Sequence, residues 1–508
     1  MNSPEIGSDK GNSVSAVTVL GVVGAGAMGQ GIAQVAMAGG IRTLLYDVSS
    51  DAAETAAASI AGRLRRLVEK NKMESAEADA AIARLTVATS LEDLAPCEAV
   101  VEAIVENIDV KRRVFRDLEA VVSPACLLAS NTSSIPIASI ASACEHRGRI
   151  AGLHFFNPVP LMRLVEVIRP VEATDATIAT LIDLGRQMGR TPVEVKDSPG
   201  FLVNMGGRAM TTEGIRILHE SVATPEQVDA VMRDCYGFRM GPFELMDLTG
   251  IDVNYPVSVF VWEGYGNDPR ITTYPEHRAL LDAGLYGRKS GRGWFDYAEG
   301  AQKPSPDFTT DAAPAKTVAL AEPNPVLESF VAAAGLTVVP DDGTVALLAA
   351  PVGLDATSTA LRTGADSRRL VCLDLIGRTD RRVVMMTAPG ADHALRDAVA
   401  AALTSETRAV TVIKDSPGFI GQRVTAAICN LGCSIAETGL AAPEDIDMAL
   451  ELGLNYPAGP MRLGEQVGAG TMLTILTALQ SLTGEDRYRP TMWLSRRARL
   501  GLPLKTAA

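Results

Sequence analysis

Residues 17–36 read Val-Thr-Val-Leu-Gly-Val-Val-Gly-Ala-Gly-Ala-Met-Gly-Gln-Gly-Ile-Ala-Gln-Val-Ala. An apolar, β-branched run leads into a turn with three glycines, and an apolar helical pattern follows the turn. Gly24 permits a tight turn, Gly26 lets the backbone approach a pyrophosphate, and Gly29 lets the helix pack closely on the strand. This order of strand, turn and helix predicts the start of a dinucleotide-binding sheet.

The helix after the turn and the next strand complete the predicted nucleotide site. Ala27 and Met28 lie in the first turn of the helix, where unpaired N–H groups and a partial positive charge attract phosphate. A second apolar run ends at Asp47, close to the spacing of about 20 residues at which a ribose-binding acid follows the glycine turn. An acid at this position accepts hydrogen bonds from both ribose hydroxyls and repels a 2′-phosphate. No arginine follows in residues 48–50, so the pattern favours NAD over NADP; the alternative is a glycine turn in an α/β unit that binds no nucleotide.

Length and charge limit the class of protein. A chain of 508 residues with 47% hydrophobic residues predicts three or four domains with buried cores. The formal net charge of −13 disfavours nucleic acid or an anionic membrane as a partner. No apolar stretch reaches the length of about 18 residues that a membrane-spanning helix would need. Residues 1–15 are polar and predict a disordered tail without a signal peptide.

The seven cysteines show no metal-binding or redox spacing. Cys429 and Cys433 lie one helical turn apart with no second pair, which favours two core residues over a ligand set. The cysteine count is typical of a reducing compartment, so we expect a cytoplasmic protein without a metal ion.

The chain contains an internal repeat. The run Lys-Asp-Ser-Pro-Gly-Phe occurs at 196–201 and again at 414–419. The same offset relates further Pro-Glu, Gly-Pro and single Asp, Leu and Gly positions in the segments that follow. So many identities at one offset indicate a duplication, and both copies have helical periodicity.

Strand-like and helical runs alternate through residue 195, which predicts a doubly wound, mainly parallel sheet. A second, shorter alternation at 317–409 predicts a small α/β domain. Its first turn, at residues 321–325, has no glycine and contains Glu322, so it should not hold a dinucleotide. The expected order is a tail at 1–15, a Rossmann domain at 16–195, a helical domain at 196–297, a linker at 298–316, a degenerate α/β domain at 317–409 and a second helical domain at 410–508.

Polar side chains follow four predicted strands of the first sheet. Because ligands bind at the carboxyl ends of strands in open α/β sheets, these clusters predict the reactive site. The clusters are Glu106 with Lys111, residues 130–134 (Ser-Asn-Thr-Ser-Ser), residues 154–158 (His-Phe-Phe-Asn-Pro) and Glu166.

His154 and Glu166 lie on two successive apolar runs that adjacent strands could bring face to face. In alcohol oxidation an imidazole removes the hydroxyl proton, and a carboxylate orients it and stabilises the imidazolium. Ser133 and Asn157 offer neutral donors for an alkoxide or carbonyl oxygen. Each interpretation has an alternative: a His satisfied in the core, a Ser133 that caps the helix near residue 136, and surface positions for Glu106 and Lys111.

These motifs together resemble the 3-hydroxyacyl-CoA dehydrogenase family, over about residues 15 to 297. The resemblance implies an N-terminal Rossmann domain and a helical domain that closes the site and forms the dimer contact. It also implies roles for single residues. His154 would be the base with Glu166 as its partner, Ser133 and Asn157 would lie at the substrate oxygens with Asn204 beside them, and Glu106 and Lys111 would bind cofactor and substrate.

The second half is similar to long bacterial members with two helical domains, several of which oxidise 3-hydroxyadipyl-CoA in phenylacetate degradation. Close relatives act on 3-hydroxybutyryl-CoA. The implied activity is NAD-dependent oxidation of (S)-3-hydroxyacyl-CoA to 3-oxoacyl-CoA. The alternatives are a hydroxyacid dehydrogenase on a substrate without CoA, and a structural NAD-binding protein without activity.

A basic CoA site would separate the first two activities, and Lys70 and Lys72 in a helical segment are candidates for it. The sequence leaves open whether the acyl chain ends in a carboxylate. Four arginines could each meet such a group, and the sequence does not rank them: Arg163, Arg208, Arg239 and Arg292.

The second copy departs from the pattern of the first. No histidine or glutamate occupies the strand around residues 383–386 that would match Glu166, and Gln422 stands at the position of Asn204. We expect a catalytically inactive half in which the two helical copies pack on each other as an internal pseudo-dimer, with homo-oligomers also possible.

Overall fold

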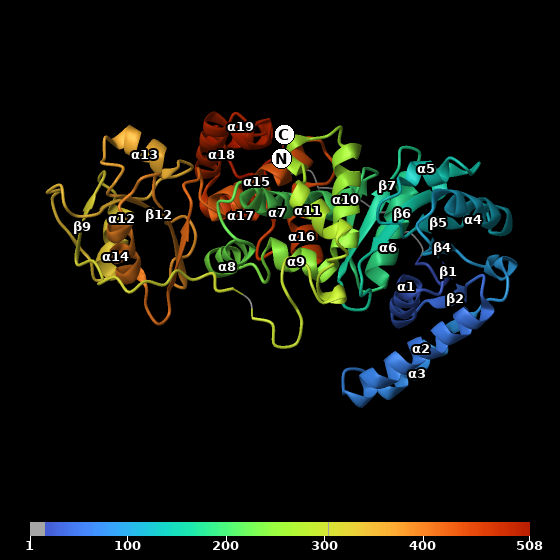
Figure 1. Ribbon diagram of the computed structural model, residues 1–508. Helices are drawn as coiled ribbons and strands as arrows, with labels where there is room; N and C mark the ends of the chain where they lie inside the picture. The colour runs from blue at the N-terminus through green and yellow to red at the C-terminus, as the bar shows by residue number, and fades with distance from the viewer. Residues whose placement is uncertain (1–15, 303, 508) are drawn as a thin grey trace, which may run out of the picture. The chain divides into compact units, whose positions relative to one another are not determined.

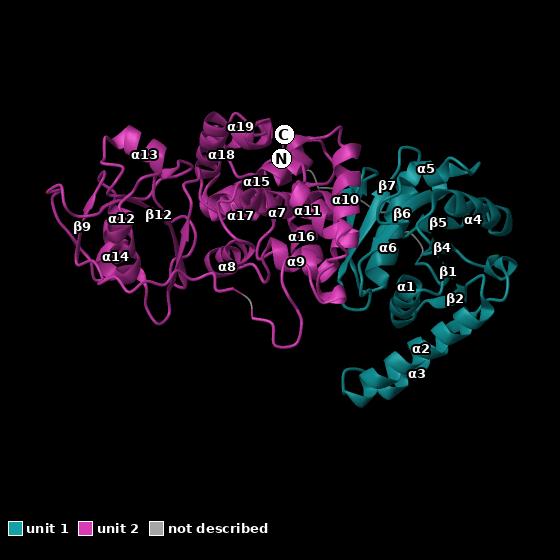
Figure 2. Cartoon of the chain, in the orientation of Figure 1, with its two compact units in different colours: residues 1–201 teal, residues 202–508 magenta. Residues whose placement is uncertain are grey.

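The computed structural model describes residues 16–302 and 304–507. The chain forms two compact units, residues 1–201 and 202–508 (Figure 2). The expected tail at 1–15 lies outside the described residues, as does position 303 of the expected linker. Within the described part, no helix is long and apolar enough to cross a membrane.

The first unit is built on an eight-stranded sheet in the order β3-β2-β1-β4-β5-β6-β7-β8. All neighbouring strands run parallel except β6 and β7 (Figure 1), which confirms the predicted mainly parallel sheet. The strands are β1 (Val19–Val23), β2 (Arg42–Tyr46), β3 (Leu85–Val87), β4 (Ala99–Glu102), β5 (Leu127–Ser130), β6 (Ile150–Phe155), β7 (Leu164–Arg169) and β8 (Thr191–Lys196). The helices are α1 (Ala27–Ala38), α2 (Ser50–Glu69), α3 (Ser75–Ile82), α4 (Ile108–Val121), α5 (Ile137–Ala141) and α6 (Asp175–Gln187).

The glycine turn between β1 and α1 shows why each glycine is required. Gly24 has φ +109°, a backbone conformation that L side chains rarely adopt. A Cβ at Gly29 would lie 1.8 Å from the carbonyl oxygen of Gly24. Buried Leu20 and Ile32 then join strand and helix in one hydrophobic core.

The second unit contains two sets of five helices in the same order. The first set comprises α7 (Phe201–His219), which starts at the boundary of the units, α8 (Pro225–Tyr236), α9 (Pro242–Thr249), α10 (Ile251–Gly264) and α11 (Pro275–Asp282). The second set comprises α15 (Gly421–Glu437), α16 (Pro443–Leu454), α17 (Pro460–Val467), α18 (Ala469–Thr483) and α19 (Met492–Leu500).

Buried carboxylates hold both sets in the same way. Asp229 accepts two backbone N–H hydrogen bonds at the start of α9, at 3.0 and 2.8 Å. Asp447, the matching residue of the repeat, accepts two at the start of α17, at 2.9 and 3.2 Å. The repeated Pro-Gly-Phe segments also share a backbone, because Phe201 has φ +52° and Phe419 has φ +50°. The duplication seen in the sequence therefore extends to hydrogen bonds and dihedral angles.

Between the two helical sets, the chain forms a smaller six-stranded sheet in the order β10-β9-β11-β12-β13-β14, with β12 and β13 antiparallel. Its strands are β9 (Thr317–Leu320), β10 (Thr337–Val338), β11 (Leu347–Ala349), β12 (Leu370–Asp374), β13 (Arg382–Met386) and β14 (Ala409–Ile413). Its helices are α12 (Pro325–Ala333), α13 (Ala356–Thr363) and α14 (His393–Leu403). The Asn324 side chain accepts hydrogen bonds from two N–H groups in the first turn of α12, so the helix end that would face a phosphate is already capped.

A buried ionic network joins the two helical sets. Arg423 on α15 is 2% exposed and lies 2.8 Å from Glu213 and 2.7 Å from Glu220. Glu213 lies on α7 of the first set, and Glu220 directly follows that helix. Glu213 also lies 3.2 Å from Arg487 and accepts a hydrogen bond from Tyr488. Although burial opposes its ionisation, the two guanidinium groups lower the pKa of Glu213. The acid and its partners thus remain charged in the core of the second unit.

Arg423→Met should lower the free energy of unfolding by about 3 kcal/mol or more, because it leaves a buried carboxylate with less compensation. Arg462→Met is the control, since Arg462 pairs with Glu451 at the surface and its loss should cost under about 0.5 kcal/mol. Urea unfolding measures both. Equal effects of the two substitutions would contradict a structural role for the network.

Candidate active site

The predicted nucleotide site lies at the carboxyl ends of β1 and β2. Asp47 accepts a hydrogen bond from the backbone N–H of Ala25 in the glycine turn, at 2.8 Å, and one from Ser49 N–H at 3.0 Å. The carboxylate therefore lies beside the turn that would hold the pyrophosphate. No described side chain caps α1 at Gly26, and a Cβ there would have no atom within 4 Å. The first turn of α1 thus offers its N–H groups to a ligand, in contrast to α12.

A buried lysine and two acids lie at the end of β4. Lys111 is 1% exposed and lies 2.7 Å from the fully buried Glu102 and 3.3 Å from Glu106. Ser130 donates to the other carboxylate oxygen of Glu102 at 2.7 Å. The alternative that Lys111 is a surface residue is therefore wrong. The sequence analysis gave Glu102 no role in the site, although an acid that closes an apolar strand was the available signal.

Glu106 is the exposed member of this group. Its carboxylate accepts hydrogen bonds from the hydroxyls of Thr132 and Ser134 and faces Lys111. Partial burial raises the pKa of Glu106, but the three donors together lower it by more than burial raises it. The pKa of Glu106 is therefore below its usual value. The cluster keeps a negative charge at the edge of the sheet and orients the Lys111 ammonium.

His154 and Glu166 face each other across the antiparallel pair β6 and β7, whose register places the two residues opposite one another. Nδ1 of His154 lies 2.6 Å from Oε2 of Glu166, and the carboxylate is fully buried. A carboxylate partner makes Nδ1 the protonated nitrogen of the neutral ring, which leaves Nε2 as the basic one. Asn131 accepts a hydrogen bond from the N–H of Phe155 at 2.8 Å, and the Phe156 ring lies 4.5 Å from the imidazole. The structure thus brings the two residues together in the geometry of an oriented base.

The remaining predicted residues lie on loops and on the second unit. Ser133 is in the loop after β5 and Asn157 in the loop after β6, and both are exposed. Ser133 does not cap α5. The Asp197 carboxylate accepts hydrogen bonds from the backbone N–H groups of the first two residues of that helix, Ile137 and Ala138, at 3.0 and 2.8 Å. Asn204 lies on α7.

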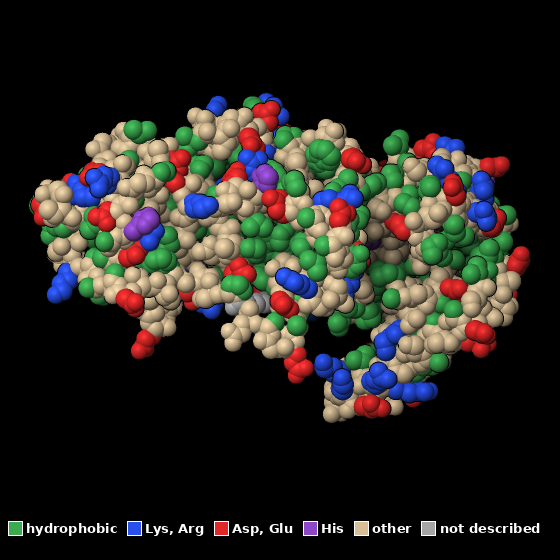
Figure 3. Space-filling view, in the orientation of Figure 1, with side chains coloured by type: hydrophobic (Ala, Val, Ile, Leu, Met, Phe, Trp, Pro, Cys, Tyr) green, Lys and Arg blue, Asp and Glu red, His purple; other side chains and the backbone are tan. Residues whose placement is uncertain are grey.

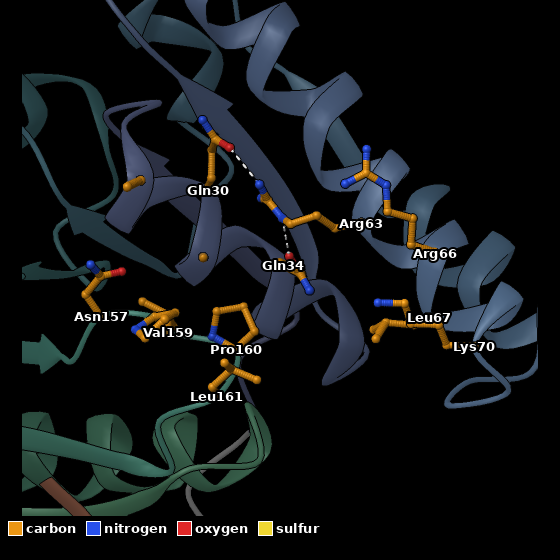
Figure 4. Close-up of a pocket in the computed structure, with 13 residues that line it drawn as sticks. Gln30, Gln34, Arg63, Arg66, Leu67, Lys70, Asn157, Val159, Pro160 and Leu161 are labelled. Atoms are coloured by element: carbon orange, nitrogen blue, oxygen red, sulfur yellow. Dashed lines mark hydrogen bonds between the residues drawn. The ribbon is translucent and has the colours of Figure 1, made fainter. Parts of the chain in front are cut away.

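A basic pocket of about 640 Å³ lies between α1, α2 and the loop after β6 (Figure 4). Arg63, Arg66 and Lys70 line it from α2 and its C-terminus, and Asn157 lies on the opposite side. The Arg63 guanidinium donates hydrogen bonds to Gln34 and Gln30, at 2.9 and 3.0 Å, which hold it in place. The lining also includes apolar residues, namely Leu67, Val159, Pro160 and Leu161, and it contains no acid.

The two lysines predicted for a CoA site differ in position. Lys70 lines the pocket, whereas Lys72 is exposed and is absent from its lining. Figure 3 shows the blue Lys and Arg atoms gathered over the end of the α2–α3 hairpin. The pocket is therefore suited to an extended ligand with phosphate groups and an apolar portion.

The second copy preserves the scaffold but not the reactive groups. In the antiparallel pair β12 and β13, Asp374 stands opposite Val384, at the places that His154 and Glu166 take in the first copy. Gln422 donates to the Asp374 carboxylate at 3.0 Å and accepts from the backbone N–H of Gly353 at 2.8 Å. The Gln422 amide and the Asp374 carboxylate are thus hydrogen-bonded to each other.

An aromatic ring fills the remaining space in the second copy. A Cβ at Gly421 would lie 2.0 Å from the Tyr236 ring, and one at Gly377 would lie 3.0 Å from it. Asp374 is 5% exposed, and burial raises its pKa. This copy therefore has neither an oriented imidazole nor an open site, and no group of His, Cys, Asp or Glu in the described chain is arranged to hold a metal ion.

Comparisons with known proteins agree with this division. A family model described as "3-hydroxyacyl-CoA dehydrogenase, NAD binding domain" matches residues 19–198. A second model, "3-hydroxyacyl-CoA dehydrogenase, C-terminal domain", matches residues 200–297 and again residues 418–507. The two helical sets are therefore both copies of one domain type.

Relatives exist over the full length and over the first half. The 3-hydroxyadipyl-CoA dehydrogenase of Escherichia coli K12 is 36% identical over 488 residues, which cover 95% of this chain and 98% of the relative. A probable 3-hydroxybutyryl-CoA dehydrogenase of Bacillus subtilis is 40% identical over 278 residues, 55% of this chain and 96% of the relative. A crystal structure described as 3-hydroxybutyryl-CoA dehydrogenase from Escherichia coli K12 is similar with a TM-score of 0.85, at 33% identity, and covers 96% of this chain and 99% of that one.

Calorimetric titration with NADH should give one site per chain, because the glycine turn after β1 is open and the turn after β9 is capped. Gly24→Val should abolish binding, since a Cβ there would lie 2.5 Å from the carbonyl oxygen of Ala103. Asn324→Ala in the second copy should leave the stoichiometry at one. A value near two would refute the claim that the second copy binds no nucleotide.

Proposed function

The chain belongs to the 3-hydroxyacyl-CoA dehydrogenase family, and on that premise we propose how its residues perform the reaction. It is an NAD-dependent dehydrogenase that interconverts 3-hydroxyacyl-CoA and 3-oxoacyl-CoA. The observation that carries the assignment of the site is the 2.6 Å contact between Nδ1 of His154 and Oε2 of Glu166. Bound NAD supplies the acceptor for the hydride that leaves the hydroxyl-bearing carbon.

His154 is the general base. Its Nε2 removes the proton of the 3-hydroxyl as the carbonyl forms, and in the reverse direction it returns that proton. Glu166 holds the ring in the tautomer that leaves Nε2 unprotonated, and its charge stabilises the imidazolium once the proton has moved. Because the carboxylate is fully buried, water does not screen this interaction.

Neutral donors orient the substrate oxygens. We assign this role to Ser133 and Asn157, whose hydroxyl and amide follow β5 and β6. The duplication supports the same role for Asn204. It corresponds to Gln422, and the Gln422 amide donates to Asp374, the residue at the place of His154. By analogy, the Asn204 amide would donate a hydrogen bond to the substrate oxygen that reacts at His154.

The cofactor residues follow from the first unit. The N–H groups of the turn at Gly24, Gly26 and Gly29 and of Ala27 and Met28 receive the pyrophosphate, and Asp47 receives the adenosine ribose hydroxyls. A 2′-phosphate at Asp47 would meet a like charge, so NAD is preferred over NADP. Lys111 with Glu106 is assigned to the cofactor at the edge of β4.

The basic pocket is assigned to the CoA portion of the substrate. Arg63, Arg66 and Lys70 place three cations over a partly apolar wall, which fits the phosphates and the pantetheine chain. A small free hydroxyacid would use none of these groups. The pocket therefore favours an acyl-CoA substrate over the rival activity on a substrate without CoA.

We assign 3-hydroxyadipyl-CoA as the preferred substrate, because the relative of that name matches 95% of the chain, including both helical sets. The crystal structure with similar coverage is described as a 3-hydroxybutyryl-CoA dehydrogenase, which makes 3-hydroxybutyryl-CoA the second candidate. A comparison of kcat/KM for the two substrates decides between them.

The second helical set takes the place that a partner subunit would otherwise fill. The buried network around Glu213 and Arg423 provides an internal contact of this kind, and the degenerate sheet adds packing without chemistry. All seven cysteines are free and buried, which fits a reducing cytoplasm.

His154→Ala should lower kcat by about 10²–10⁴-fold, the usual contribution of a positioned general base. NADH affinity should change little, because the imidazole lies on β6 and the phosphate turn on β1. His146→Ala, an exposed histidine, is the matched control. The assignment fails if the His154 variant retains more than a tenth of wild-type turnover.

Arg66→Gln with Lys70→Gln should raise KM for an acyl-CoA substrate about ten-fold with little change in kcat, since the two cations contribute binding and no chemistry. The salt dependence of KM should weaken as well. Lys72→Gln, outside the pocket, should change KM less than about two-fold. Equal effects of Lys72 and the pocket pair would place the CoA phosphates elsewhere.

A further inference from the structure

Arg208 on α7 is a buried cation whose hydrogen-bond partners are neutral. Arg208 is 6% exposed. In the described part of the chain no Asp or Glu forms an ion pair with it. Its Nε donates to the carbonyl oxygen of Asn204 at 2.9 Å, and its Nη1 donates to Ser258 on α10 at 2.6 Å. The guanidinium is thus held in one position by neutral groups alone.

The neighbours of Arg208 do not supply the missing charge. Burial lowers the pKa of Arg208 to about 10, and Tyr456 is the group whose influence opposes this shift. The Tyr456 hydroxyl is itself buried and has no hydrogen-bond partner within the described residues. His277 stays neutral, because burial first and Arg208 second lower its pKa to about 3. A buried charge of this kind is costly unless an anion compensates it.

Arg208 is also close in the chain to Asn204, the residue of α7 that we assign to the substrate oxygens. It follows Asn204 by one helical turn, so the two share one side of the helix, about 6 Å apart along the axis. The opposite side of α7 is occupied, because a Cβ at Gly206 would lie 2.7 Å from Leu450 of the second helical set. The Arg208 side chain reaches back along the helix, because its Nε donates to the carbonyl oxygen of Asn204 at 2.9 Å. In a six-carbon substrate with two carboxyl ends, only three bonds separate the hydroxyl-bearing carbon from the carbon of the distal carboxylate, so its two oxygen-bearing ends can meet neighbouring groups of this kind.

We propose that Arg208 binds the distal carboxylate of a dicarboxylic 3-hydroxyacyl-CoA and so determines the substrate preference. This inference rests on the proposed function, specifically on Asn204 being at the substrate oxygen. Arg163, Arg239 and Arg292, the other arginines that the sequence offers for this group, are exposed. A planar guanidinium with its position fixed pairs with a carboxylate through two hydrogen bonds, which a mobile surface arginine does less well.

The test compares 3-hydroxyadipyl-CoA with 3-hydroxyhexanoyl-CoA, which has the same chain length and lacks the second carboxylate. In the wild type, kcat/KM should favour the dicarboxylic substrate by about 30-fold or more, mainly through KM, the usual effect of a buried charge pair. Arg208→Met should remove this preference, and Arg208→Lys, which keeps the charge, should retain part of it. Arg239→Met is the exposed control and should leave the ratio of the two kcat/KM values as in the wild type.

A second measurement uses the wild-type protein, so that the proposal can be tested even if the Arg208 variants do not fold. The inhibition constant of adipoyl-CoA for the wild type should be lower than that of hexanoyl-CoA by about 30-fold or more. The proposal is overturned if wild-type protein binds the two equally, or if Arg208→Met lowers kcat/KM for both substrates in the same proportion, which is the result of a purely structural role. Failure of the wild type to oxidise either substrate would instead refute the proposed function.

Discussion

The hydrogen bond between Nδ1 of His154 and Oε2 of Glu166 depends on one exception in an otherwise parallel sheet. Only an antiparallel neighbour places the two residues directly opposite, and a slip of one residue would turn Glu166 to the other face. A carboxylate with no exposure is tolerated when its charge is used in hydrogen bonds. The register of β6 and β7 therefore sets both the stability of this acid and the orientation of the His154 ring. In the proposed function, the glycine turn, Lys111 with its two acids, and the basic pocket bind cofactor and substrate around that point.

The duplicated half shows that scaffold and chemistry are separable. Asp447 repeats the helix-binding role of Asp229, and Asp415 binds the N-terminus of α13 as Asp197 binds that of α5. These acids satisfy helix ends that would otherwise be buried without partners. His154 and Glu166 bind no helix end, and the second copy has Asp374 and Val384 at their places. What persists in the second copy is what the fold needs.

Much of this could be predicted from the sequence, because its signals are local. The glycine turn with Asp47 and the spacing of His154 and Glu166 reflect constraints within one or two neighbouring elements, and the repeat could be recognised from an identical run of six residues. The sequence did not decide whether Lys111 is buried, because its burial depends on an ion pair with Glu102, which ends β4 while Lys111 lies on α4. The helix that begins at Ile137 is capped by Asp197, which follows β8 much later in the chain, so a nearby serine was the wrong candidate. Arg208 stood out among four arginines only once its burial was known.

The pairing of His154 with Glu166 is tested most directly by the position of the proton on the His154 ring, observed by ¹⁵N NMR of histidine side chains in the resting protein at neutral pH. Loss of signals in His154→Gln assigns the resonances among the five histidines of the chain. We expect a proton on Nδ1 that is strongly deshielded by its hydrogen bond to the carboxylate, and loss of that deshielding in Glu166→Gln. A ring protonated on Nε2, or a signal that Glu166→Gln leaves unchanged, would contradict the pairing.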